Sequence, residues 1–173
     1  MSEDSGILAM LAGGDRRSIG RVPEVVAAVL GEPALLAELI AGMTHGDPVV
    51  AMRAADAAEK VTAERPEWLA AYKDQLLGPV AASAQQEVRW HVAQMLPRLA
   101  LSGDERARAA AALIGYLGDR SAIVRTFALD ALAQLAADDE ELRGRVLPLL
   151  RDAERSESAA VRSRVRRLLA KLR

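Results

Sequence analysis

The chain has 173 residues, of which 51% are hydrophobic and 27% are charged, and its formal net charge is −1 at pH 7. It contains no cysteine, which excludes disulfide bonds, thiolate metal ligands and a cysteine nucleophile. The first residues are acidic and precede a very short apolar run, unlike a signal peptide, and no apolar run approaches the roughly 20 residues of a membrane span. We therefore expect a cytoplasmic protein with no membrane segment.

Residues 1–21 contain four glycines, at positions 6, 13, 14 and 20. Glycine lowers helix stability and favours turns. This stretch is predicted to be a flexible or short helical lead, and residues 22–173 are predicted to form a single domain.

Prolines, glycines and capping residues divide the rest of the chain into short helices. Pro23 suits the first turn of a helix, and Asp47 before Pro48 combines an N-cap with a first-turn proline. Pro97 is expected to kink its helix or end it early. The predicted helices span residues 23–30, 33–43, 47–64, 66–80, 85–101, 104–117, 120–136, 139–152 and 157–172.

Four segments align without a gap, and their starts lie 38, 36 and 37 residues apart. They read VAMRAADAAEKV, VRWHVAQMLPRL, VRTFALDALAQL and VRSRVRRLLAKL, beginning at Val50, Val88, Val124 and Val161. This period indicates helical pairs that stack, with the aligned segment in the second, or B, helix of each pair. The fold class is therefore predicted to be all-α.

The aligned segments share apolar residues at offsets 0, 4, 8 and 11 from the first valine, which lie on one narrow helix face. The predicted core residues are Val50, Ala54, Ala58, Val61, Val88, Val92, Leu96, Leu99, Val124, Ala128, Leu132, Leu135, Val161, Val165, Leu169 and Leu172. Eleven residues before each first valine, the A helices add Leu39, Leu77, Leu113 and Leu150.

A Val-Arg pair opens three of the four segments, and Asp119 precedes the second of them. This pattern resembles the second helix of HEAT repeats over about residues 33–173. The resemblance implies a right-handed α-α superhelix, or alpha-solenoid, of about four helical pairs whose B helices line the concave side. It also implies that turn acids and B-helix arginines form a structural ladder between repeats, here Arg89, Arg125, Arg162 and Asp119. Ala51, Gln86 and Ser158 depart from that pattern.

The face of the B helices that points away from the core supplies the candidate binding residues. They are Met52, Asp56, Trp90, Gln94, Thr126, Asp130, Ser163 and Arg167. Tryptophan is a common anchor of protein interfaces, although Trp90 is equally suited to packing on a neighbouring helix. The resulting hypothesis is a non-catalytic protein-binding or scaffold module, with a protein segment as its partner.

The C-terminal region supports an alternative. Residues 1–142 hold 13 Lys and Arg against 21 Asp and Glu, whereas residues 143–173 hold 10 against 3. The cluster of Arg162, Arg164, Arg166, Arg167, Lys171 and Arg173 is either a solvated last helix or a contact for nucleic acid or an acidic partner. Its polar outer side also resembles the cap of a solenoid, which favours a monomer.

Catalysis is not expected. The only histidines, His45 and His91, have no second imidazole at ligand spacing, so neither a metal nor a cofactor is predicted. A HEAT-like DNA glycosylase, which uses a concave carboxylate with tryptophans, is a distant third possibility. Gln94 stands one turn after Trp90, and an amide cannot replace that carboxylate.

Overall fold

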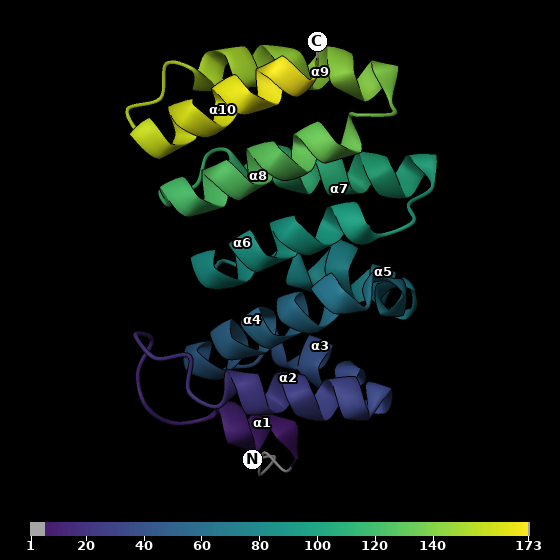
Figure 1. Cartoon of the computed structure of the whole chain (residues 1–173), viewed down its shortest axis with the longest axis vertical. Helices are drawn as coiled ribbons and strands as arrows, with labels where there is room; N and C mark the ends of the chain where they lie inside the picture. Colours follow the sequence, from purple (N-terminus) through teal and green to yellow (C-terminus); the bar gives the residue numbers. More distant parts are fainter. Residues whose placement is uncertain (1–5, 173) are drawn as a thin grey trace. The chain divides into compact units, whose positions relative to one another are not determined.

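The computed structural model describes residues 6–172, whose regular secondary structure is helical, with no strand (Figure 1). The chain divides into two compact units, unit 1 up to Leu99 and unit 2 from Ala100. Each unit has its own buried apolar residues.

Unit 1 is built around one long helix. Its elements are α1 (Ile7–Leu11), α2 (Val22–Gly31), η1 (Pro33–Leu35), α3 (Leu36–Gly42), α4 (Pro48–Glu64), η2 (Pro66–Tyr72), α5 (Lys73–Gln75), η3 (Leu76–Val80), α6 (Gln86–Met95) and η4 (Leu96–Arg98). Helix α4 packs against α1, α2, α3, η2 and α6. It begins as predicted, because the Asp47 carboxylate accepts a hydrogen bond from the Val49 backbone nitrogen at 2.8 Å.

Two predicted helices of unit 1 are irregular. Residues 66–80 form a 3-10 turn, a short α-helix and a π turn, with non-helical dihedral angles at Gly78 before Pro79. The helix predicted over 85–101 ends at Met95 and continues as the 3-10 turn η4. Pro97 has no amide hydrogen to donate, so the prediction that it ends the regular helix is confirmed.

Unit 2 consists of two helical pairs joined by short turns. Its helices are α7 (Gly103–Tyr116), α8 (Ala122–Leu135), α9 (Glu140–Ala153) and α10 (Ala159–Lys171). Each begins at a side-chain N-cap, and Ser102 with Glu105 forms a complete capping box at α7. Helix α8 packs against α7, α9 and α10.

The predicted core positions are buried, except at the end of the last helix. Leu169 and Leu172 are only half-buried, whereas Leu168 is buried. The buried positions 161, 165 and 168 follow the 3.6-residue period of a helix. The core residue in the last turns of α10 is therefore Leu168, and the prediction of Leu169 was wrong.

The lead before α2 contains a short helix, which is one of the two alternatives predicted for it. Helix α1 buries Ile7 and Leu11 and packs against α2, α3 and α4, while residues 1–5 lie outside the described part of the chain. The exposed stretch after α1 is held by the buried guanidinium of Arg53. This group donates to the carbonyls of Leu11 (2.7 Å), Gly13 (2.6 Å), Asp15 (3.2 Å) and Ser18 (3.1 Å).

Replacing Arg53 with methionine removes these four bonds and keeps much of the side-chain volume. We expect the free energy of unfolding to fall by about 2–4 kcal/mol, because carbonyl groups lose a charged donor. Amide hydrogen exchange should accelerate over residues 7–20. Arg16→Met, at an exposed position of the same stretch, is the control. Equal exchange in both variants would show that Arg53 does not hold the segment.

Candidate binding site in unit 1

A pocket of about 340 Å³ opens in unit 1 between the stretch after α1, helix α4 and the first turns of α6. Its lining residues are Arg16, Arg17, Ser18, Ile19, Met52, Arg53, Asp56, Lys60, Glu87, Trp90 and His91. The hydrogen bonds of Arg53 hold the stretch after α1, which forms one wall of the pocket. Helices α4 and α6 form the other two walls and pack directly against each other.

Two carboxylates in this pocket have unused hydrogen-bonding capacity. Asp56 accepts from Lys60 one turn later through Oδ1, while its Oδ2 is buried and has no partner within residues 6–172. Glu87 is only 8% exposed, and no described residue forms a hydrogen bond or ion pair with its carboxylate. Asp56 Oδ2 is a buried acceptor without a donor, which is costly. Both groups are therefore available to a ligand that carries donors.

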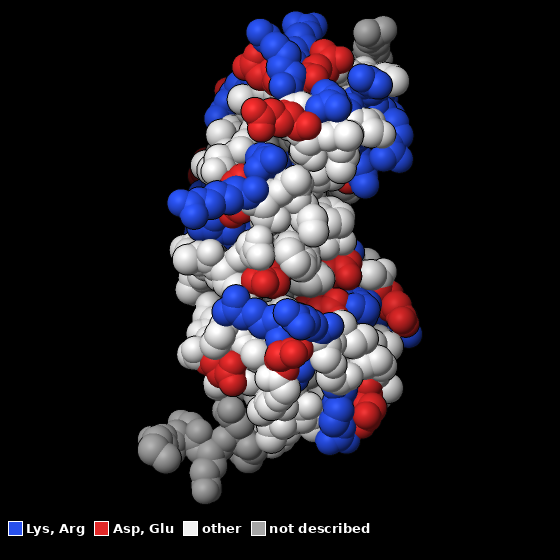
Figure 2. Space-filling model, turned by 90° about the vertical axis from the view of Figure 1, so that its left-hand side faces the viewer, with Lys and Arg blue, Asp and Glu red and all other residues white. Residues whose placement is uncertain are grey.

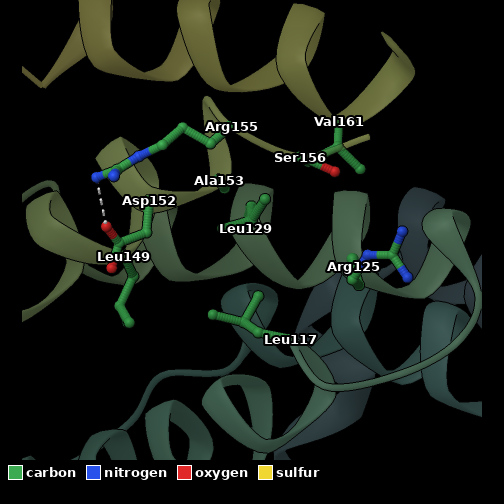
Figure 3. A pocket seen from close by; sticks show the side chains of 9 residues that line it. All are labelled: Leu117, Arg125, Leu129, Leu149, Asp152, Ala153, Arg155, Ser156 and Val161. Atoms are coloured by element: carbon green, nitrogen blue, oxygen red, sulfur yellow. Dashed lines mark hydrogen bonds and ion pairs between the residues drawn. The ribbon is translucent and has the colours of Figure 1, made fainter. Parts of the chain in front are cut away.

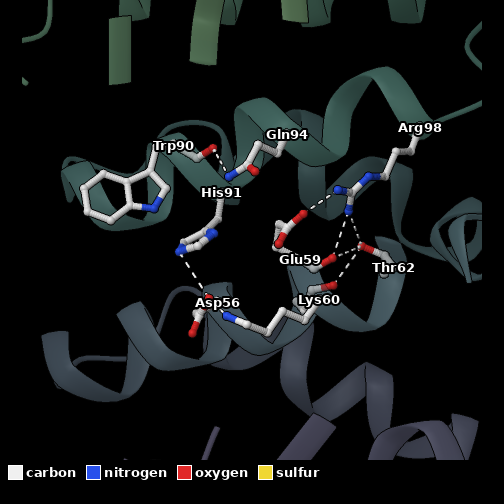
Figure 4. A network of polar contacts seen from close by, with 9 residues as sticks. Asp56, Glu59, Lys60, Thr62, Trp90, His91, Gln94 and Arg98 are labelled. Carbon is white, nitrogen blue, oxygen red and sulfur yellow. Dashed lines mark hydrogen bonds and ion pairs between the residues drawn. The ribbon is translucent and has the colours of Figure 1, made fainter. Parts of the chain in front are cut away.

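His91 lines the same pocket and is itself buried. Its ring lies next to that of Trp90, with centroids 5.6 Å apart, and its Nε2 is 3.8 Å from Asp56 Oδ1 (Figure 4). Burial lowers the pKa of the imidazole to about 4, against the opposing effect of nearby carboxylates, of which Asp56 is the strongest. His91 is therefore neutral at pH 7.

A second network fixes α6 and η4 to the end of α4. Arg98 pairs with the Glu59 carboxylate and donates to the Glu59 carbonyl at 2.9 Å and to Thr62 Oγ1 at 3.1 Å (Figure 4). Arg98 thus holds the C-terminal end of the α6–η4 segment beside α4.

Of the predicted binding residues in unit 1, three line the pocket and one does not. Asp56 and Trp90 line it as half-buried side chains. Met52 also lines it, but it is buried rather than directed to solvent as predicted, because the stretch after α1 and the start of α6 close over that part of α4. Gln94 lies outside the lining and donates its side-chain amide to the Trp90 carbonyl at 3.2 Å.

The predicted residues of unit 2 form no comparable site. Thr126 Oγ1 donates to the Ala122 carbonyl at 2.7 Å, and Ser163 and Arg167 are exposed. Asp130 pairs with Arg164 of α10. Burial raises the pKa of the Asp130 carboxyl, and the charge of Arg164 opposes this effect. Asp130 thus already has a cationic partner.

The arginines predicted to form a ladder bind the turn before their own helix. Arg125 donates to the Asp119 carbonyl and Arg162 to the Ser156 carbonyl, both at 2.6 Å. Arg89 donates in the same way to the carbonyl of Ser83, also at 2.6 Å. The recurrent bond supports a structural role, while the ladder between repeats stays a prediction.

The basic C-terminal cluster is partly engaged within unit 2. Arg162 and Arg164 use their guanidinium groups as described above, whereas Arg166, Arg167 and Lys171 are exposed. Arg173 lies outside the described residues. Figure 2 shows both basic and acidic side chains at the end of the molecule that holds the C-terminus. The ion pair of Arg164 with Asp130 lowers the net positive charge of this cluster, whereas the bonds of Arg162 to neutral carbonyls do not.

Unit 2 has a pocket of about 350 Å³ between α8, α9 and α10, with a largely apolar lining (Figure 3). Leu117, Leu129, Leu149 and Val161 line it, and an exposed ion pair of Asp152 and Arg155 stands at its edge. Unlike the pocket in unit 1, this one contains no buried carboxylate. It therefore offers fewer directional contacts to a ligand with hydrogen-bond donors than the pocket in unit 1 does.

Comparison with known proteins gives no assignment: no family model and no curated protein matches this chain. Within residues 6–172, no helix is long and apolar enough to cross a membrane. The same residues contain no group of three or more His, Cys, Asp or Glu side chains placed to hold a metal ion.

Sequence analysis missed several residues that line the pocket. Glu87 precedes the aligned segment of its helix, so it was not compared with the B-helix positions. Lys60 stands four residues after Asp56, a spacing that favours an ion pair on a helix. Arg53 and the stretch at residues 16–19 gave no such signal, because their contact joins residues about 35 to 42 positions apart.

The neutral state of His91 makes stability depend on pH. An imidazole in the unfolded chain has a pKa near 6.5, and that of His91 in the folded chain is about 4. Between these values the unfolded state binds more protons, so the free energy of unfolding should fall as pH decreases from about 6.5 to 4, by on the order of 3 kcal/mol at most. Denaturant titrations at several pH values measure this effect.

Substitution of His91 by glutamine isolates that contribution from the titration of carboxylates. The pH dependence of unfolding should become flatter in His91→Gln than in the wild type. His45→Gln is the control, because it removes the other imidazole and leaves His91 in place. Parallel curves for the wild type and His91→Gln would contradict the assignment.

Proposed function

We propose that this protein is a non-catalytic protein-binding or scaffold module that holds a segment of a partner on the α4–α6 surface of unit 1. The observation that carries the proposal is the pocket that Trp90 shares with the half-buried Asp56 and the buried Glu87. A half-buried aromatic ring beside incompletely satisfied acceptors combines an apolar contact with directional hydrogen bonding.

The architecture we propose is a HEAT-like, right-handed alpha-solenoid of about four helical pairs. It is supported by the repeated aligned segments and by the equivalent bonds of Arg89, Arg125 and Arg162 to their preceding turns. Such repeats commonly present extended binding surfaces. The cytoplasmic location and the monomeric state stay predictions.

A nucleic-acid contact through α10 is the second candidate, favoured by the exposed side chains of Arg166, Arg167 and Lys171. Binding of a labelled DNA duplex would then weaken steeply with salt, because phosphate contacts release counterions. Combined Arg166→Gln and Arg167→Gln should reduce both the affinity and its salt dependence. An unchanged salt slope would remove this candidate.

The first proposal is tested by selecting binders from a displayed random-peptide library on the whole protein. Peptides that bind the wild type should lose about tenfold or more in affinity on Trp90→Ala, because loss of an interface tryptophan typically costs more than 1 kcal/mol. Fluorescence polarisation of the synthesised peptides measures the change.

Trp68→Ala is the matched control for that experiment. Trp68 is also half-buried, but it lies in η2 and does not line the pocket. Peptides that bind Trp90→Ala as tightly as the wild type would contradict the proposed surface. Thermal unfolding of both variants identifies any loss of binding that is due to unfolding.

A further inference from the structure

We propose that the pocket of unit 1 binds a C-terminal basic residue, with the guanidinium or ammonium group at Asp56 and Glu87 and the terminal carboxylate at Arg16 and Arg17. This assignment rests on the proposed function and specifies its ligand. It follows from the separation of charge within one pocket, whose lining joins the half-buried Asp56 and the buried Glu87, here called the floor, with the exposed Arg16 and Arg17, here called the rim.

The floor favours a cation that carries several donors. Glu87 has no donor among the described residues, and Asp56 Oδ2 is buried without a partner. An anionic or apolar group placed there would leave both carboxylates desolvated, which is unfavourable. A guanidinium or ammonium group instead supplies charge-assisted hydrogen bonds to acceptors that lack them.

Asp56 already binds a cation in the folded chain. Lys60 pairs with its Oδ1, and the Lys60 side chain is 46% exposed, so it can turn toward solvent when a ligand enters. The two carboxylates then share the pocket with Arg53, whose donors are directed to the carbonyls after α1, and with Arg16 and Arg17, which the terminal carboxylate of the ligand would contact. His91 is neutral and adds no repulsion.

Trp90 and the rim complete the recognition of the ligand. The half-buried indole lines the same pocket and offers a ring face to the aliphatic stem or the cation. Arg16 and Arg17 are exposed, and neither guanidinium has an ion-pair partner among residues 6–172. When the basic side chain of the C-terminal residue extends toward Asp56 and Glu87, the terminal carboxylate of the same residue would lie near Arg16 and Arg17.

The test uses three small probes on the whole protein. N-acetylarginine carries the guanidinium and the carboxylate, N-acetylarginine amide lacks the carboxylate, and N-acetylcitrulline lacks the cation. Two-dimensional ¹H–¹⁵N NMR follows the Trp90 indole signal and the amides of residues 16–19. N-acetylarginine should shift these signals saturably, with the amide several-fold weaker and the citrulline probe about tenfold weaker.

Variants separate the two halves of the site. Glu87→Gln should weaken N-acetylarginine about tenfold, whereas Arg16→Gln combined with Arg17→Gln should reduce it to the affinity of the amide probe. Lys60→Met removes the competing cation and should tighten binding of N-acetylarginine. That gain would not arise from a damaged fold.

Several results would overturn the assignment. These are equal binding of the citrulline probe, no saturable shift with N-acetylarginine at its solubility limit, or weaker binding in Lys60→Met. Displayed peptides that require Trp90 but lack a C-terminal basic residue would also overturn it. In that last case the proposed function would stand, because a protein segment would still bind the α4–α6 surface.

Discussion

The donation of arginine N–H groups to backbone carbonyls is the interaction on which both units depend. Helix ends and turns leave carbonyl oxygens without an intrahelical donor, and the chain has only five aromatic residues to fill its core. Arg53 orders the stretch after α1, and Arg98 attaches η4 to the end of α4. Arg125 and Arg162 do the same for the turns before α8 and α10.

This use of arginine has a consequence for the pocket in unit 1. Arg53 is buried with its donors directed toward the stretch after α1, so that stretch becomes a wall of the pocket rather than a free loop. The carboxylates of Asp56 and Glu87, which also line the pocket, still have capacity to accept hydrogen bonds. The pocket therefore combines a rigid support with unused acceptors, an arrangement suited to recognition of a ligand with donors.

The two units differ in how their acidic residues are used. Asp130 of α8 is paired with Arg164 of α10, whereas Asp56 of α4 is paired with Lys60 of its own helix. An exposed lysine is displaced more easily than an arginine anchored on another helix, because it has fewer fixed contacts. This difference explains why equivalent positions of the repeat give an internal ion pair in unit 2 and a candidate binding site in unit 1.

The sequence by itself determined the helical class, most of the core and three residues of the candidate site. Helix periodicity is a local property, so the buried faces of α4, α6 and α8 followed from spacing alone, as did the position of Asp56 and Trp90 outside the fully buried face, where both are half-buried. The early end of α6 at Pro97 was equally local, because proline lacks the amide donor. In α10 the offsets taken from the other aligned segments predicted Leu169 in the core. Leu168 is buried instead, because the buried face of this helix follows the 3.6-residue period.

Only the tertiary structure decided that Met52 is covered, that His91 is neutral and that Arg53 holds one wall of the pocket. Each of these outcomes depends on residues from separate elements, and a linear pattern contains no information on which carbonyl a long side chain will reach. Burial and its effect on pKa likewise depend on packing by α4 and α6 together. The charge arrangement of the candidate site is therefore a property of the folded unit rather than of any one helix.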